Sequence, residues 1–172
     1  MHIAVLATLA YLLGAVPFGL LVARLRGVDI RNQGSGNIGA TNVFRCVGKG
    51  WGVSTFALDA LKGFAPAFFF PRVAGLDSDW GVLFGMAAII GHSFPVYLGF
   101  KGGKGVATSA GMLLGIAPLA VGIGFVCWVA CMAVSRYVSL SSIVAVLAAA
   151  AAGWVDPRQE SLAVQTVLSL LA

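Results

Sequence analysis

A glycine-rich segment between two apolar stretches carries the side chains best suited to chemistry. Residues 34–50 read GSGNIGATNVFRCVGKG, with five glycines among small hydroxyl and amide residues. Glycine lets the backbone approach a ligand closely, and successive N–H groups in such a loop form a concave anion site. Hydroxyls and amides add hydrogen-bond donors, and arginine adds a fixed two-pronged positive charge. The predicted phosphate site consists of Gly34, Ser35, Gly36, Asn37, Thr41, Asn42 and Arg45.

A second glycine-rich segment, residues 91–108, reads GHSFPVYLGFKGGKGVAT. We expect a helix to begin near Val106, so that the backbone donors of Gly102–Gly105 lie at its N-terminus, where the helix dipole also favours an anion. This predicts a second phosphate site, formed by Lys101, Gly102, Gly103, Lys104 and Gly105. Lys49 and Lys104 are each followed by Gly rather than Ser or Thr, so neither segment is a Walker loop and an ATPase is disfavoured.

Three further ionisable residues lie within or at the end of apolar stretches. His92 has either a direct chemical role or a hydrogen-bonding one. Asp59 and Lys62 are three residues apart, so on a helix they share a face and can neutralise each other. Ionisable groups at membrane depth are often functional, but a buried structural ion pair is an equal alternative. The three cysteines have no metal-ligand spacing, and we expect neither a metal nor a cofactor.

The elements that must position these residues are membrane helices. The 172 residues include only 11 Lys+Arg and 6 Asp+Glu, and the mean hydropathy is +0.96. Uncharged stretches cover residues 1–23, 80–100, 105–135 and 137–155, each long enough to cross a hydrocarbon layer of about 30 Å. This predicts an all-α polytopic membrane protein with one domain, residues 1–172, and excludes a soluble enzyme, a nucleic-acid-binding domain and a disulfide-stapled module.

The charges between the apolar stretches predict the topology. Residues 24–50 hold five of the eleven basic residues and should be cytoplasmic by the positive-inside rule, which also explains the net charge of +5 without nucleic acid. Residues 71–79 should face outward, which places the N-terminus outside. The predicted helices are Ile3–Ala23 with a kink at Pro17, Trp51–Phe70, Trp80–Leu98, Val138–Val155 and the beginning of another at Ser161–Ala172.

Residues 106–134 form either one long tilted helix or two short ones broken around Gly115–Pro118. The positive-inside rule does not distinguish one helix from two, because both arrangements place eight basic residues on the cytoplasmic side and two on the outer side. We favour two helices, since Asp156 and Glu160 then lie outside with Asp77 and Asp79. The total is about seven helices, the last of them cut short.

Both glycine-rich segments closely resemble the first two signature motifs of the bacterial acyl-phosphate glycerol-3-phosphate acyltransferases. The resemblance spans almost the whole chain and includes ALDALKG at 57–63. It implies an enzyme of the bacterial inner membrane, with seven helices, an outside N-terminus and cytoplasmic signature loops. Its expected partners are acyl phosphate, glycerol 3-phosphate and the bilayer, with no nucleic acid, and we expect a monomer. The family's third motif, with a His, an Asn and a Glu, would follow Ala172, so we expect a truncated chain or impaired activity.

The resemblance also implies a reaction: acylation of position 1 of glycerol 3-phosphate, which yields lysophosphatidic acid and phosphate for phospholipid synthesis. Ser35, Arg45 and Lys104 match the family's catalytic and substrate-holding residues, and the second segment's glycines match its glycerol 3-phosphate site. His92 is a further catalytic candidate, with Asp59 and Lys62 in support. The His-x4-Asp pair of thioester-dependent acyltransferases is missing, so our hypothesis is that the departing phosphate takes the proton. The alternative function is an anion transporter, although no inverted repeat is visible.

Overall fold

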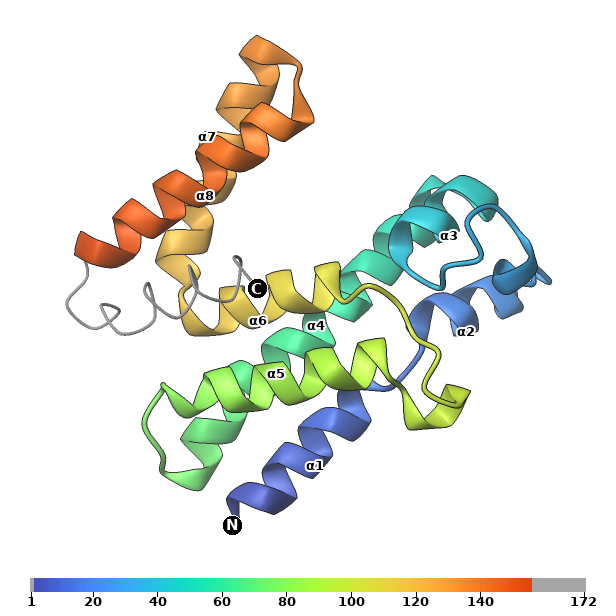
Figure 1. Cartoon of the computed structure of the whole chain (residues 1–172), viewed down its shortest axis with the longest axis horizontal. Coiled ribbons are helices and arrows are strands. Elements are labelled where there is room, and N and C mark those ends of the chain that lie inside the picture. Colours follow the sequence, from blue (N-terminus) through green and yellow to red (C-terminus); the bar gives the residue numbers. More distant parts are fainter. Residues whose placement is uncertain (1, 156–172) are drawn as a thin grey trace. The chain divides into compact units, whose positions relative to one another are not determined.

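The computed structural model describes residues 2–155, in which every regular element is a helix (Figure 1). This confirms the predicted all-α membrane fold. The chain divides into two compact units, Met1–Ile116 and Ala117–Ala172. The single domain predicted for residues 1–172 stays a prediction, and the helix expected to begin at Ser161 lies outside the described residues.

The first unit contains most of the elements. They are α1 Ile3–Gly14, α2 Phe18–Leu25, the 3-10 turn η1 Ile30–Asn32, α3 Ala40–Cys46, α4 Lys49–Ala74, α5 Trp80–Ser93, the 3-10 turn η2 Val96–Leu98 and α6 Val106–Ile116. Four stretches of the described chain are long and apolar enough to cross a membrane: Ile3–Leu25, Lys49–Ala74, Trp80–Leu98 and Pro118–Ser135. Shorter apolar helices cover Val106–Ile116 and Leu140–Ala152. The total of seven spans stays a prediction.

Proline divides the first membrane stretch into two helices. The sequence predicted one kinked helix, but α1 ends at Gly14 and α2 begins at Phe18. Pro17 has no N–H to donate and its ring clashes with the preceding turn, so a helix cannot continue through it undisturbed. The break leaves the Val16 carbonyl outside the hydrogen-bond ladders of both helices.

The long apolar stretch 106–134 also forms two helices, as predicted. The break falls at Ala117, and Pro118 takes the first position of α7, Pro118–Ser135, where a missing N–H costs nothing. The 11 residues of α6 rise only about 16 Å. This length is too short for α6 to cross the hydrocarbon layer by itself.

Helices of the first unit approach each other to backbone contact. A Cβ atom on Gly63 of α4 would lie 2.0 Å from the carbonyl oxygen of Thr108, and one on Gly111 of α6 would lie 1.8 Å from that of Ala60. Such contacts require glycine and are typical of helix packing in lipid. α4 also packs against α1, α2, α3 and α5, so it is the central helix of this unit.

The second unit is a helical hairpin. α7 packs along α8, Val138–Val155, whose bounds agree with the predicted ones. Arg136 joins the two helices in a left-handed conformation with φ 58°. At the crossing, a Cβ on Gly124 would lie 2.9 Å from the Ala145 carbonyl.

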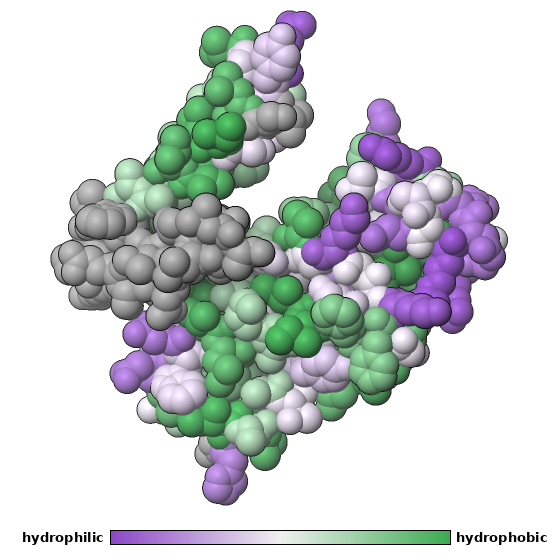
Figure 2. Space-filling model, in the orientation of Figure 1, coloured by the Kyte–Doolittle hydropathy of each residue, from purple (hydrophilic) through white to green (hydrophobic). Residues whose placement is uncertain are grey.

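Hydrophilic residues gather at one end of the first unit, over the loops around α3 (Figure 2). An apolar core lies beneath them and consists of Leu20, Val22, Ala23, Ile30, Ile38 and Val43. This core connects α2, η1 and α3, so the polar loops rest on a packed base.

Candidate active site

Asn42 organises the first loop, residues 29–48, from within. Its side chain is 3% exposed. The amide nitrogen donates to the carbonyls of Ile30, Gln33 and Asn37 at 3.3, 3.0 and 2.9 Å, and the amide oxygen accepts the Ser35 N–H at 3.0 Å. The sequence suggested Asn42 as a donor to an anion, but the structure uses its donors to hold the loop closed.

The neighbouring polar residues divide into loop-forming and outward-facing groups. The Asn37 carboxamide oxygen accepts the Gly39 N–H at 2.7 Å, and the Ser35 hydroxyl oxygen accepts the Asn37 N–H at 3.5 Å. Gly34 and Gly36 have φ of 58° and 69°, a conformation that favours glycine. Asn37 thus shapes the turn. Ser35 is exposed, and its hydroxyl group can still donate a hydrogen bond to a ligand.

Arg45 is the cation that the first loop presents to its surroundings. It lies in the last turn of α3 and its side chain is exposed. Within residues 2–155 the guanidinium makes no hydrogen bond or ion pair. Thr41, one turn earlier on α3, is exposed as well. Both are therefore available to an anionic ligand.

The second loop, residues 99–105, is attached to the end of α5. The Gly102 N–H donates to the Ser93 carbonyl and the Gly103 N–H to the His92 carbonyl, each at 3.1 Å. The sequence predicted that these two groups would serve an anion at the start of α6. Because both are occupied, the expected set of donors is reduced.

The remaining donors of the second loop are those nearest the helix start. α6 begins at Val106, as predicted. The N–H groups of Lys104 and Gly105 make no hydrogen bond in the described part of the chain. The Lys104 and Lys101 side chains are exposed. Their ammonium groups make no hydrogen bond or ion pair with any residue in 2–155. An anion here would meet the helix dipole, two backbone donors and two cations.

One hydrogen bond joins the two loops. Nη2 of Arg31, in η1, donates to the Lys101 carbonyl at 2.9 Å. Leu98, just before the second loop, also packs against the apolar core beneath the first. In the sequence, Arg31 is one of the five basic residues of 24–50, and no motif pairs it with a carbonyl 70 residues away.

A buried ionisable cluster lies behind the second loop. Lys62 Nζ is 2.8 Å from Asp59 Oδ1, as the three-residue spacing predicted, and His92 Nδ1 is 3.6 Å from the same oxygen. None of the three residues is more than 5% exposed. Nζ of Lys62 also donates to the Val16 carbonyl at 2.8 Å. The cluster therefore connects α4 with α5 and with the break at Pro17.

His92 carries this connection to the second loop. A Cβ atom on Gly103 would lie 2.2 Å from His92 Nε2, and one on Gly102 would lie 2.0 Å from the His92 carbonyl oxygen. The imidazole is thus sandwiched between Asp59 and the loop backbone. This places His92 where it can position the loop that carries Lys104.

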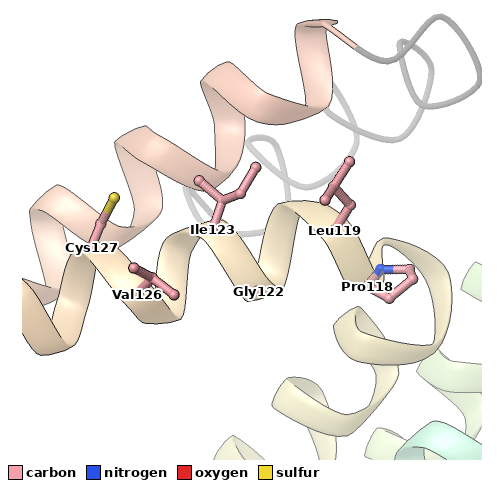
Figure 3. Close-up of a pocket in the computed structure, with 6 residues that line it drawn as sticks. All are labelled: Pro118, Leu119, Gly122, Ile123, Val126 and Cys127. Carbon is pink, nitrogen blue, oxygen red and sulfur yellow. The ribbon is translucent and has the colours of Figure 1, made fainter.

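An apolar pocket lies on α7 (Figure 3). It is lined by Pro118, Leu119, Gly122, Ile123, Val126 and Cys127. The lining contains no charged side chain, and none of the predicted site residues contributes to it. In the described residues, no group of three or more His, Cys, Asp or Glu side chains could hold a metal ion.

Comparison with known proteins identifies the family of this chain. The family model described as glycerol-3-phosphate acyltransferase matches residues 4–172. The chain belongs to the glycerol-3-phosphate acyltransferase family. A glycerol-3-phosphate acyltransferase from Aquifex aeolicus is 50% identical over 145 residues, which cover 84% of this chain and 75% of the relative. One from Allorhizobium ampelinum is 48% identical and covers 98% of this chain and 83% of the relative.

Solved structures of the same family agree with the fold. The crystal structure of PlsY (YgiH), an integral membrane glycerol 3-phosphate acyltransferase, in its glycerol 3-phosphate form is 43% identical with a TM-score of 0.79. It covers 96% of this chain and 83% of the solved one. The lysophosphatidic acid form of that protein is 42% identical, with the same TM-score and coverage. The family suggested by the two signature segments is confirmed, as is an integral membrane protein of the acyltransferase class.

Proposed function

We propose that this chain transfers an acyl group from acyl phosphate to position 1 of glycerol 3-phosphate, giving lysophosphatidic acid and phosphate. The observation that carries the proposal is a pair of exposed cations, Arg45 and Lys104, on two loops. Residues 2–155 provide neither cation with a hydrogen-bond or ion-pair partner and join the two loops by one hydrogen bond. Two anionic substrates need two such cations close together. The solved structures of a family member in glycerol 3-phosphate and lysophosphatidic acid forms support the acceptor and the product.

The chemical step needs little from the protein beyond position and charge. The acceptor hydroxyl oxygen attacks the acyl carbonyl carbon, the bond from that carbon to the phosphate oxygen breaks, and the departing phosphate takes the hydroxyl proton. Arg45 and Lys104 offset the repulsion between two anions and stabilise charge on the departing phosphate. The Ser35 hydroxyl and the N–H groups of Lys104 and Gly105 donate to phosphate oxygens.

The remaining predicted residues take supporting roles in this proposal. Gly34, Gly36, Asn37 and Asn42 shape the first loop, and Gly102 and Gly103 attach the second loop to α5. Thr41 and Lys101 are exposed, Thr41 one turn before Arg45 on α3 and Lys101 three residues before Lys104. Asp59 and Lys62 hold His92 against the second loop, so His92 acts as a positioning residue. We propose further that the site faces the cytoplasm of a bacterium, in its inner membrane, because the basic loops contain it.

Purified protein in lipid vesicles provides the test. An acyl phosphate is supplied with and without glycerol 3-phosphate, and released phosphate and lysophosphatidic acid are measured. Release of phosphate that depends on glycerol 3-phosphate, with equal amounts of lysophosphatidic acid, supports the proposal. Uptake of labelled glycerol 3-phosphate into the vesicles without either product would instead indicate a carrier.

A further inference from the structure

We infer that Arg31 is a positioning residue that holds the two loops of the site at a fixed separation. Each loop is held by hydrogen bonds of its own: Asn42 closes the first, and bonds to the His92 and Ser93 carbonyls attach the second to α5. Between residues 29–48 and 99–105, the described chain contains a single hydrogen bond, from Arg31 Nη2 to the Lys101 carbonyl.

The backbone at Arg31 is held in place by its neighbours. Ile30, the residue before it, is 0% exposed in the apolar core, and the Arg31 N–H donates to the Asp29 carboxylate at 3.2 Å. The backbone of the first loop then turns closely past it, because a Cβ on Gly36 would lie 3.0 Å from the Arg31 carbonyl oxygen. The guanidinium therefore starts from a backbone that is fixed on both sides.

The position of the acceptor gives this contact its effect. Lys101 stands at the start of the short run that ends in Lys104 and Gly105, and its carbonyl belongs to the backbone. Pulling that carbonyl toward η1 sets the distance of Lys104 from Ser35 and Arg45. A transfer between two bound substrates depends steeply on their relative placement, and an error of about 1 Å can cost about a hundredfold in rate.

A guanidinium suits this task better than an ammonium. The planar fork carries five N–H donors, so one can bind the carbonyl while the others remain hydrated at the exposed surface. A lysine could reach the same carbonyl from a single point and should replace arginine only in part. Leu98 packs against the apolar core beneath the first loop, but an apolar contact has no preferred direction. The hydrogen bond from Arg31 therefore sets the relative position of the two loops.

The first arm of the test is kinetic and rests on the proposed function. Arg31→Gln should lower kcat/KM by about tenfold to a hundredfold, with Arg31→Lys intermediate and thermal stability in detergent nearly unchanged. Arg24→Gln is the matched control: it removes the same charge from the same basic region, and the described residues give the Arg24 side chain no hydrogen bond or ion pair. It should retain wild-type kcat/KM.

The second arm does not depend on activity. Cysteines at Gln33 and Lys101, in a variant without native cysteines, carry nitroxide labels, and the dipolar broadening of the EPR spectrum reports the separation of the loops. The label at Lys101 leaves the backbone carbonyl in place. Arg31→Gln should weaken or spread the broadening, while Arg24→Gln should not.

The two measurements distinguish failure of the proposed acyl transfer from failure of the positioning role of Arg31. If no acyl transfer occurs in any variant but Arg31→Gln spreads the loop separation, the proposed function fails and the positioning role stands. An unchanged separation in Arg31→Gln overturns the positioning role, whether or not kcat/KM falls, since a fall would then mean that Arg31 acts directly on a substrate.

Discussion

The ammonium of Lys62 lies 2.8 Å from the carbonyl oxygen of Val16, inside the break between α1 and α2. Pro17 cannot extend the helix. Apart from Lys62, residues 2–155 give this carbonyl one partner, the N–H of Phe18 two residues later, at 3.1 Å. The same ammonium is paired with Asp59. A buried charge in the central helix thus stabilises a proline break in the first one.

Replacing Lys62 with methionine should strongly destabilise the protein. The substitution leaves the Asp59 carboxylate buried beside His92 without its cation, and breaking a buried ion pair in this way typically costs about 3 to 5 kcal/mol. The free energy of unfolding in detergent gives the measurement. The double variant Lys62→Met and Asp59→Leu should recover much of the loss, and Lys49→Met, at the exposed start of α4, should have little effect. Equal stability of Lys62→Met and Lys49→Met would contradict the role of the cluster.

Gly103→Ala should lower the thermal stability of the protein, and a second substitution at His92 should restore part of it. The new methyl would lie 2.2 Å from His92 Nε2, so the ring or the second loop must move. Adding His92→Ala makes space and should restore part of the lost thermal stability. Gly102→Ala should not respond, because it meets the backbone carbonyls of His92 and Ser93 at 2.0 and 2.6 Å. Gly50→Ala, with nothing within 4 Å, serves as the neutral control.

Asn42→Asp should disrupt the first loop even though the shape of the side chain is kept. A carboxylate cannot donate to the three carbonyls that the amide now binds. Its negative charge would be buried among carbonyl oxygens that no longer have a hydrogen-bond donor. We expect at least a tenfold loss of kcat/KM, on the order of 1 to 3 kcal/mol, and faster proteolysis of the loop. Gln33→Ala, which removes an exposed side chain and leaves the backbone acceptor, should be close to wild type.

Arg45→Lys and Lys104→Ala test the proposed clamp on phosphate charge. An ammonium cannot reproduce a two-pronged guanidinium contact, and loss of one transition-state contact typically costs about a hundredfold to a thousandfold in rate. Initial-rate kinetics in both substrates, on variants with wild-type melting temperatures, give the measurement. If both variants kept near-wild-type kcat/KM, the residues would serve only to orient the chain in the membrane.

A cysteine at Ser35 tests the proposed orientation. With the native cysteines removed, membrane-impermeant thiol reagents should fail to label it in intact cells and should label it in inverted vesicles. A cysteine at Asp77, in the connection after α4, should give the opposite pattern. Labelling of the Ser35 position from outside would overturn the orientation and the cytoplasmic site together.

The apolar elements follow closely from the sequence. Val138–Val155 agrees at both ends, and the break before Pro118 was expected, because uncharged runs and prolines act locally on the backbone. The Asp59–Lys62 pair also follows from helical spacing alone. The kink expected at Pro17 is wrong: the stretch divides there into two helices, α1 and α2.

The site was harder to predict because its polar groups act on each other. The sequence identifies Asn42 and Gly103 as donors, but whether a donor faces a ligand or a carbonyl depends on how the loop closes. Arg31 illustrates the remaining gap, since its acceptor is a backbone carbonyl with no residue-type signature. Arg45 and Lys104 are exposed, as expected for cations in glycine-rich loops, and their roles in the site stay a prediction.

The reciprocal contacts of Gly63 with Thr108 and of Gly111 with Ala60 constrain how the chain is built into a membrane. A translocating channel releases segments into lipid by their own apolarity and length, and the 11 residues of α6 are too few to satisfy it alone. α4 is synthesised earlier and is long enough to enter lipid first. Its Ala60 and Gly63 then let α6 pack at backbone contact. We therefore expect insertion of α6, and of the second loop that leads directly into it, to depend on Ala60 and Gly63 of α4.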